Sequence, residues 1–349
     1  MFKNKDRFGM KVIGIDGGAT KVSGGIVEKI NSNTFKLIDS AVDIQYADHP
    51  NYDSDFSPLP LDSQLGNEIS SDEKQQGLVY IECVIEVIES LAESDPFKIA
   101  IAMPGIKTKD GRGIAAMANG PCIPDFCDQI EKALHLDSPI KKLESDADMC
   151  TWGEEFAEEG AFRNVENAYY LGGGTGTADG LKLKGKLVPF DETSNWIAKS
   201  IELKMPDGRL LESYASMFGI NALRESKTDA EIGTVLGNLL FERISTVHSG
   251  WKNQFQIDRK LNADHPYSNT LLDRIVIGQR LSQFLQSEDG EAIHQTMVAD
   301  LVQQCLSADN SISDHFLIDG EFNQDRIFMS DLRVAPIIGL GTKVWLTQC

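Results

Sequence analysis

The sequence predicts an α/β protein of two domains, each carrying a β-hairpin with a glycine-rich turn. At 349 residues the chain is long for a single hydrophobic core. Apolar runs of strand length and apolar periods of helix length follow one another along most of it. Two strand pairs, at 11–27 and 168–183, are joined by turns rich in glycine and threonine. We expect the chemistry of the protein to lie at these two turns.

The first turn combines a carboxylate, two glycines, a hydroxyl and an ammonium: Asp16, Gly17, Gly18, Thr20 and Lys21. Glycine reaches positive φ and lets a ligand approach the backbone amides, which can bind a phosphate. A carboxylate is the ligand type that Mg²⁺ takes, together with water and phosphate oxygens. An Asp-Gly-Gly turn is also an ordinary hairpin signal with no function, and both interpretations stay open at this point.

The next elements lead to a candidate base. We predict a strand at 35–42, a polar surface loop at 43–68, a helix over 71–94 and a strand over 97–105 that ends at a turn. Ser145 is a good N-cap for a helix running to Gly160, so Asp146 lies between a strand end and a helix start. Asp146 either complements the helix dipole or acts as a general base toward a substrate hydroxyl.

The second turn repeats the first in outline. Strands at 168–171 and 178–183 flank four residues with flexible backbone or hydroxyl groups: Gly174, Thr175, Gly176 and Thr177. Beyond it the apolar spacing predicts helices over 196–201, 210–223, 229–247, 275–285 and 292–306, and a strand over 316–321. We expect the apolar segment 336–341 to pack back near the first domain.

Composition excludes several classes of partner. The formal net charge of −20 argues against non-specific binding to nucleic acid or to anionic membranes. No stretch has the apolar length of a membrane span, and no signal-type run follows the charged N-terminus. The six cysteines are scattered without a C-x-x-C pair, which indicates a reduced, cytoplasmic location. With the first strand beginning near residue 11, we expect no DNA-binding repressor domain.

Several segments together resemble a known family. Residues 16–21 are similar to the first phosphate motif of the actin–Hsp70–sugar-kinase superfamily, and most closely to that of the ROK family of sugar kinases and repressors. The other similar segments follow in the same order: Met103-Pro104-Gly105 before Asn119, Ser145-Asp146-Ala147-Asp148, Gly174–Gly180, and Leu211-Glu212-Ser213-Tyr214-Ala215-Ser216.

The resemblance implies two ribonuclease-H-like lobes with an active-site cleft between them, formed by 1–118 plus 331–349 and by 119–330. It implies ATP-dependent phosphorylation of a hexose or related sugar, with both glycine turns on the nucleotide and a homodimeric assembly. Asp146 would be the general base, and Asp16 would hold Mg²⁺ through water. Asn119 and Glu212 would bind sugar hydroxyls.

The sequence also departs from that family. Its site of one His and three Cys is missing before Glu212, so we predict no structural zinc. Glu192 is a loose substitute for the Glu of the family's Glu-x-Gly-His motif. Asp319-Gly320-Glu321 stands where we expect the C-terminal Gly-Gly-Gly nucleotide loop. Two other hypotheses therefore stay open: a catalytically impaired sugar- or nucleotide-binding relative, and a sugar-independent ATPase.

Overall fold

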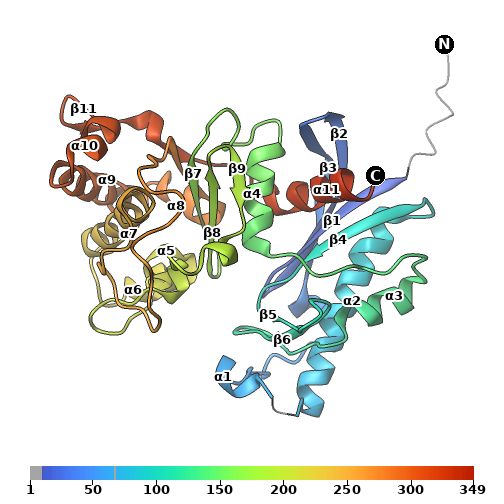
Figure 1. Ribbon diagram of the computed structural model, residues 1–349. Coiled ribbons are helices and arrows are strands. Elements are labelled where there is room, and N and C mark those ends of the chain that lie inside the picture. The colour runs from blue at the N-terminus through green and yellow to red at the C-terminus, as the bar shows by residue number, and fades with distance from the viewer. Residues whose placement is uncertain (1–9, 67) are drawn as a thin grey trace. The chain divides into compact units, whose positions relative to one another are not determined.

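The computed structural model describes residues 10–66 and 68–349 and divides the chain into two compact units (Figure 1). The first unit runs to Glu158 and takes in Val334–Cys349, and the second is Glu159–Arg333. Residues 1–9, where we predicted no signal segment, lie outside the described residues. Within the described ranges, no helix has the length and hydropathy that a bilayer crossing requires.

The first unit is built on a four-stranded sheet in the order β3-β2-β1-β4. The strands are β1 (Lys11–Gly17), β2 (Lys21–Asn31), β3 (Thr34–Gln45) and β4 (Phe97–Ala102). The first three pair antiparallel, and β4 pairs parallel to β1. A parallel bridge from Ala102 to Glu144 continues the sheet beyond β4. Three antiparallel strands followed by two parallel segments is the ribonuclease-H-like arrangement that we predicted.

Helices cover both faces of this sheet because successive strand residues point to opposite sides. Ile13 and Ile15 pack on the side of α2 (Ser71–Ala92), in one buried cluster. Val12 packs on the other side, where α4 (Asp146–Phe156) meets α11 (Ala335–Thr347). The remaining short elements of this unit are α1 (Leu61–Gln64), α3 (Phe126–Leu134), β5 (Ile106–Lys107) and β6 (Ile114–Ala116).

The boundary between the units falls at 158/159 rather than at the predicted 118/119. Helix α4 binds residues 119–158 to the first unit, since Met149 is buried with Leu340 and Val344 of α11. The approach of α4 to α11 is close: a Cβ on Gly153 would lie 2.1 Å from the carbonyl oxygen of Ala335. The predicted return of 336–341 to the first domain is confirmed.

The second unit repeats the sheet pattern, in the order β13-β10-β7-β8-β9. Its strands are β7 (Ala168–Gly173), β8 (Thr177–Leu183), β9 (Lys186–Val188), β10 (Arg274–Gly278) and β13 (Ile327–Met329). Strands β7, β8 and β9 pair antiparallel, while β10 and β13 run parallel to β7. The helix predicted over 275–285 is wrong, because its first part is β10 and only α8 (Gln279–Leu285) is helical.

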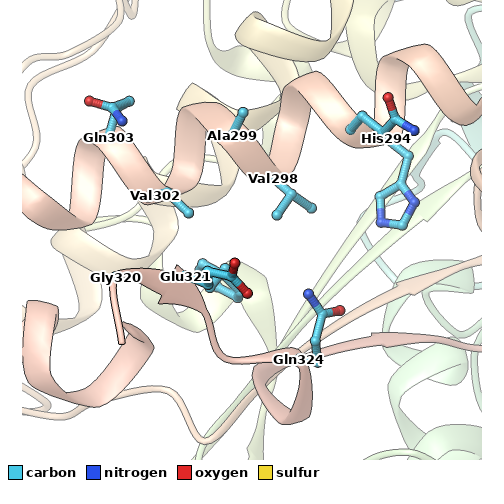
Figure 2. Close-up of a pocket in the computed structure, with 10 residues that line it drawn as sticks. His294, Val298, Ala299, Val302, Gln303, Gly320, Glu321 and Gln324 are labelled. Carbon is cyan, nitrogen blue, oxygen red and sulfur yellow. The ribbon is translucent and has the colours of Figure 1, made fainter. Parts of the chain in front are cut away.

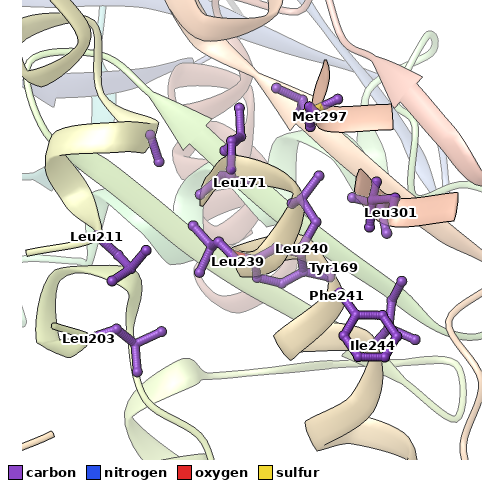
Figure 3. Packing of buried hydrophobic residues seen from close by; sticks show 14 of the residues in the cluster. Tyr169, Leu171, Leu203, Leu211, Leu239, Leu240, Phe241, Ile244, Met297 and Leu301 are labelled. Atoms are coloured by element: carbon purple, nitrogen blue, oxygen red, sulfur yellow. The ribbon is translucent and has the colours of Figure 1, made fainter. Parts of the chain in front are cut away.

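The core of the second unit lies between β7 and two long helices (Figure 3). Tyr169 and Leu171 of β7 are buried with residues of α7 (Asp229–Ser249) and α9 (Glu291–Leu306). Both helices confirm the predictions for 229–247 and 292–306. The predicted helix over 210–223 is broken into α5 (Glu212–Ala215) and α6 (Met217–Leu223). The segment 196–201 is not an α-helix.

Candidate active site

The first glycine turn is held by hydrogen bonds to its carbonyl oxygens. The Gly18 N–H donates to the Lys21 carbonyl at 2.8 Å, and the Tyr80 hydroxyl donates to the Ala19 carbonyl at 2.8 Å. Within the described part of the chain, the N–H groups of Ala19 and Thr20 donate to no protein acceptor. The turn therefore presents two amides that an anion such as a phosphate can bind.

The two predicted key carboxylates lie at the same end of the first sheet. Asp16 is opposite Ala102 in the β1–β4 register, and Ala102 bridges Glu144. Asp146 follows two residues later, as the first residue of α4, and Ser145 caps that helix by accepting from the Asp148 N–H at 3.3 Å. Neighbouring strands lie about 4.8 Å apart, so Glu144 lies roughly two strand spacings from Asp16, and Asp146 begins its helix two residues beyond Glu144.

The surroundings of Asp16 disfavour its negative charge. Burial, followed by the charge of Asp146, raises the pKa of Asp16 to about 7 against the opposing charge of Lys21. Lys21 is engaged elsewhere, since its Nζ lies 2.6 Å from Oδ2 of Asp43. In the described ranges, no hydrogen bond or ion pair satisfies the Asp16 carboxylate.

The donor set fits Mg²⁺ better than a metal enclosed by protein side chains. The described residues contain no group of three or more His, Cys, Asp or Glu side chains arranged to hold a metal ion. Mg²⁺ usually binds through one or two carboxylates, with water and phosphate oxygens completing its octahedron. Asp16 has no partner among the described residues and belongs to the turn that carries the open amides of Ala19 and Thr20, which fits this mode of Mg²⁺ binding.

Asn119 is exposed in a turn that follows β6, and two buried side chains fix that turn. Gln64 accepts the Met117 N–H at 2.8 Å and donates to the Met117 carbonyl at 2.9 Å. Glu73 accepts the Cys122 N–H at 3.0 Å. Sequence analysis missed Gln64 because it lies in the polar segment 43–68, and no local pattern marks its side chain as buried.

The second glycine turn directs several of its groups inward. The Gly174 N–H donates to the Gly176 carbonyl at 2.8 Å, and the Thr177 N–H donates to Oε1 of Glu212 at 3.2 Å. The N–H groups of Thr175 and Gly176 donate to no acceptor in the described part of the chain. These two amides are the ones that this turn can offer to an anion.

Glu212 and Glu192 have very different surroundings. Glu212 begins α5 and lies against the turn, where a Cβ on Gly176 would be 2.7 Å from Oε1 of Glu212. Burial raises the pKa of Glu212, and the hydrogen bond from Thr177 partly offsets this. Glu192 is exposed in a 3-10 turn, and no described residue hydrogen-bonds or pairs with its carboxylate. The structure therefore gives Glu212, but not Glu192, a fixed place at a glycine turn.

Comparison with solved structures identifies the fold. The inorganic polyphosphate/ATP-glucomannokinase of Arthrobacter sp. strain KM superposes with a TM-score of 0.58 at 17% identity, covering 97% of this chain and 100% of that one. A ROK-family glucokinase of Streptomyces griseus, in complex with glucose and AMPPNP, gives 0.56 at 14% identity over 96% and 98%. The chain therefore has the same fold as these two sugar kinases.

The ROK fold is not confined to enzymes. A ROK-family transcriptional regulator, a homologue of the E. coli MLC protein, superposes with a TM-score of 0.55 at 12% identity, over 96% of this chain and 78% of that one. By sequence alone, no family model and no curated protein matches the chain.

Asp319-Gly320-Glu321 lies in a separate two-stranded sheet, not in the five-stranded sheet that carries the second glycine turn. Residues 319 and 320 turn the hairpin from β11 (Leu317–Ile318) to β12 (Glu321–Phe322), both at positive φ. Glu321 lines a cavity of about 500 Å³ together with α9 residues such as His294 and Val298 (Figure 2). The segment that bridges Gly173 is instead Gln279, directly after β10. Our expectation of two carboxylates in the C-terminal nucleotide loop is therefore corrected.

Proposed function

We propose that this protein is an ATP-dependent kinase that phosphorylates a hydroxyl of a hexose or related sugar. The observation that carries the proposal is the pair formed by Asp16 and Asp146 at one end of the first sheet, beside a turn with open amides. The ROK sugar-kinase fold supports it. That the two glycine turns face one cleft stays a prediction, as do a homodimer, a cytoplasmic location, and the absence of nucleic-acid partners and of a His/Cys zinc site.

Each residue of the proposed site has a distinct task. Asp146, half-buried at a helix start, accepts the proton of the attacking sugar hydroxyl. Asn119 and Glu212 orient the sugar through its other hydroxyls. Open amides of the turns bind phosphate oxygens, which suits a reaction that depends on positioning and electrostatics. Asp16 would hold Mg²⁺ through water, and that ion, when bound, supplies positive charge to the phosphates.

A sugar panel tests the proposal directly. ATP consumption is measured with hexoses and N-acetylhexosamines, for the wild type, Asp146→Asn and a matched control. The control is Asp72→Asn, which removes an exposed aspartate from the first turn of α2. We expect sugar-dependent turnover that falls about 10²- to 10⁴-fold in Asp146→Asn, the usual contribution of a general base, and is unchanged in the control.

Two outcomes would replace the proposal. ATP hydrolysis that needs no sugar and survives Asp146→Asn would identify a sugar-independent ATPase. Binding of sugar or AMPPNP without any turnover would identify a binding protein. The second alternative has one structural argument in its favour, because the N–H of Thr177 in the second turn already donates to Glu212.

A further inference from the structure

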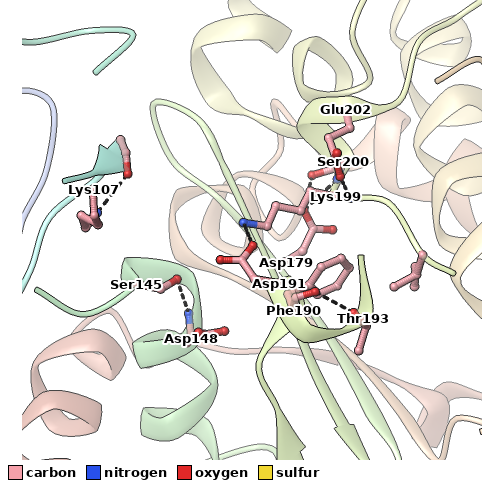
Figure 4. A network of polar contacts seen from close by, with 12 residues as sticks. Lys107, Ser145, Asp148, Asp179, Phe190, Asp191, Thr193, Lys199, Ser200 and Glu202 are labelled. Carbon is pink, nitrogen blue, oxygen red and sulfur yellow. Dashed lines mark hydrogen bonds and ion pairs between the residues drawn. The ribbon is translucent and has the colours of Figure 1, made fainter. Parts of the chain in front are cut away.

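A buried group of hydrogen bonds is formed by β8, the strand that follows the second glycine turn; Figure 4 shows its Asp179 and Ser200. Its centre is Asp179 of β8, which is 3% exposed. The Tyr169 hydroxyl donates to Oδ1 of Asp179 at 2.7 Å. The N–H and the hydroxyl of Ser200 both lie on Oδ2, at 2.8 and 2.7 Å. A buried carboxylate is costly unless hydrogen-bonded, and three donors satisfy this one.

The same Ser200 hydroxyl connects this carboxylate to the glycine turn. Its Oγ also lies 2.8 Å from Oγ1 of Thr177. A serine hydroxyl has one proton, and an ionised carboxylate can only accept. The Ser200 hydroxyl is within donor distance of both Oδ2 of Asp179 and Oγ1 of Thr177. Because a charged acceptor forms the stronger hydrogen bond, we assign the Ser200 proton to Asp179 and the proton of the Ser200–Thr177 bond to the Thr177 hydroxyl.

Both protons of Thr177 are thus used inside the protein. The hydroxyl proton is directed to Ser200, and the N–H donates to Glu212. The oxygen of the half-buried Thr177 hydroxyl keeps its lone pairs for a ligand. A phosphate oxygen has no proton to donate and would be repelled there, whereas an O–H group would be bound.

We propose that Asp179 is a positioning residue that fixes Thr177 as a hydrogen-bond acceptor for a ligand O–H group. The inference rests on the proposed function and refines it. The donor is a hydroxyl of the acceptor sugar or a water molecule on Mg²⁺. The phosphates contact the open amides of Thr175 and Gly176 rather than Thr177, which divides this turn into a phosphate-binding part and a hydroxyl-binding part.

The design of the test follows from the geometry. Thr177→Val keeps the shape of the side chain and removes the acceptor, while Thr177→Ser keeps it. In Asp179→Asn the amide oxygen should occupy the Oδ2 position, because the Ser200 N–H there can only donate. The Ser200 hydroxyl can then still donate to residue 179, and the Thr177 hydroxyl can still donate to Ser200. Ser200→Ala removes the internal acceptor and releases the Thr177 proton toward ligands.

Binding is measured calorimetrically, without turnover, using glucose, mannose, AMPPNP with Mg²⁺ and AMPPNP without Mg²⁺. We expect Thr177→Val to weaken binding of either the two sugars or AMPPNP with Mg²⁺ about 3- to 10-fold, the usual net contribution of a hydrogen bond, and to leave binding of Mg²⁺-free AMPPNP unchanged. A loss confined to the sugars identifies a sugar hydroxyl, and a loss confined to AMPPNP with Mg²⁺ identifies a metal-bound water. Ser200→Ala should tighten Mg²⁺-free AMPPNP, because the released hydroxyl can then donate to phosphate.

Weaker binding of Mg²⁺-free AMPPNP by Thr177→Val would overturn the inference, because Thr177 would then contact a phosphate or a ribose hydroxyl of the nucleotide rather than the acceptor sugar or a metal-bound water. So would equal losses in Asp179→Asn and Thr177→Val, which would mean that the carboxylate acts through its charge alone. A wild-type protein that binds none of the four probes would refute the proposed function itself, and the inference with it. If Thr177→Val unfolds, Ser200→Ala decides the matter, because unchanged or weaker binding of Mg²⁺-free AMPPNP by that variant would overturn the inference.

Discussion

Replacing Asp16 by Asn should stabilise the protein at high pH. Burial and the neighbouring Asp146 raise the pKa of Asp16 from 3.8 to about 7 on folding. A carboxyl group with a raised folded-state pKa holds its proton more tightly in the folded chain than in the unfolded one. Its contribution to stability is therefore fully present below pH 3.8 and is lost as the pH rises through about 7.

The structure sets the size of this effect. Each pKa unit corresponds to about 1.4 kcal/mol, so the difference between 3.8 and about 7 gives an upper limit of about 4 kcal/mol at pH 8. The side chain is only half-buried and solvent screens part of the charge, so we expect a gain of about 2–4 kcal/mol for Asp16→Asn. The variant should also lose the decline in stability between pH 5 and about 7 that the wild type shows.

Urea denaturation at pH 5, 6.5 and 8 measures the free energy of unfolding, and hydrogen exchange of peptides from β1 and β2 assigns it to the first unit. Asp72→Asn is again the control, and Mg²⁺ should stabilise the wild type more than Asp16→Asn. Because Asp146 contributes to the raised pKa of Asp16, Asp146→Asn should stabilise the protein as well. The double variant should gain less free energy of unfolding than the sum of the two single gains. Parallel pH profiles for Asp16→Asn and the wild type would refute the electrostatic account.

Three further substitutions test the packing that supports the site. Gly153→Ala should destabilise by about 1–3 kcal/mol in urea denaturation, although alanine favours helices, because its Cβ would meet the Ala335 carbonyl at 2.1 Å. Gln64→Leu should free the Asn119 turn and raise the KM for sugar, with the kcat changed less. Arg243→Met should lower the free energy of unfolding by about 3–5 kcal/mol, because it leaves the Glu242 carboxylate buried without the cation 2.9 Å away.

Local signals predicted the elements that carry the site. Alternating apolar strands around glycine gave both hairpins, and the Ser145 cap gave the start of α4. One helix end and one loop differ from the prediction, for physical reasons that are not visible in the local sequence. Helix α4 stops at Phe156 instead of running to Gly160, because Ala157 is extended and bridges Phe35 of the sheet. The predicted surface loop at 43–68 contains Tyr46, which is fully buried and stacks on Tyr80 at 3.7 Å.

The largest error concerned the second sheet. Residues 275–277 are an apolar run, and Leu281 and Leu285 continue it at helical spacing, so the whole segment matched a helix. Only pairing with β7, more than a hundred residues earlier, shows that the run is the strand β10. A helix over 275–285 hides the strand end at Gly278, so the sequence pattern points to Asp319-Gly320-Glu321 as the strand-end turn, whereas the structure pairs Gln279 with Gly173.

The two glycine turns show why a repeated motif need not have a repeated chemistry. Both connect antiparallel strands at the start of the same sheet pattern, and both keep two open amides within the described residues. In the first turn the adjacent carboxylate, Asp16, has no hydrogen-bond or ion-pair partner among the described residues, and in our proposal it holds Mg²⁺ through water. In the second turn, Asp179 and Glu212 accept hydrogen bonds from groups of the protein. Thr177 is hydrogen-bonded to Ser200, 23 residues away, and to Glu212, 35 residues away. That difference lies in tertiary contacts rather than in the turn, so the motif alone predicts a phosphate site but not the hydrogen bonds that we propose restrict it.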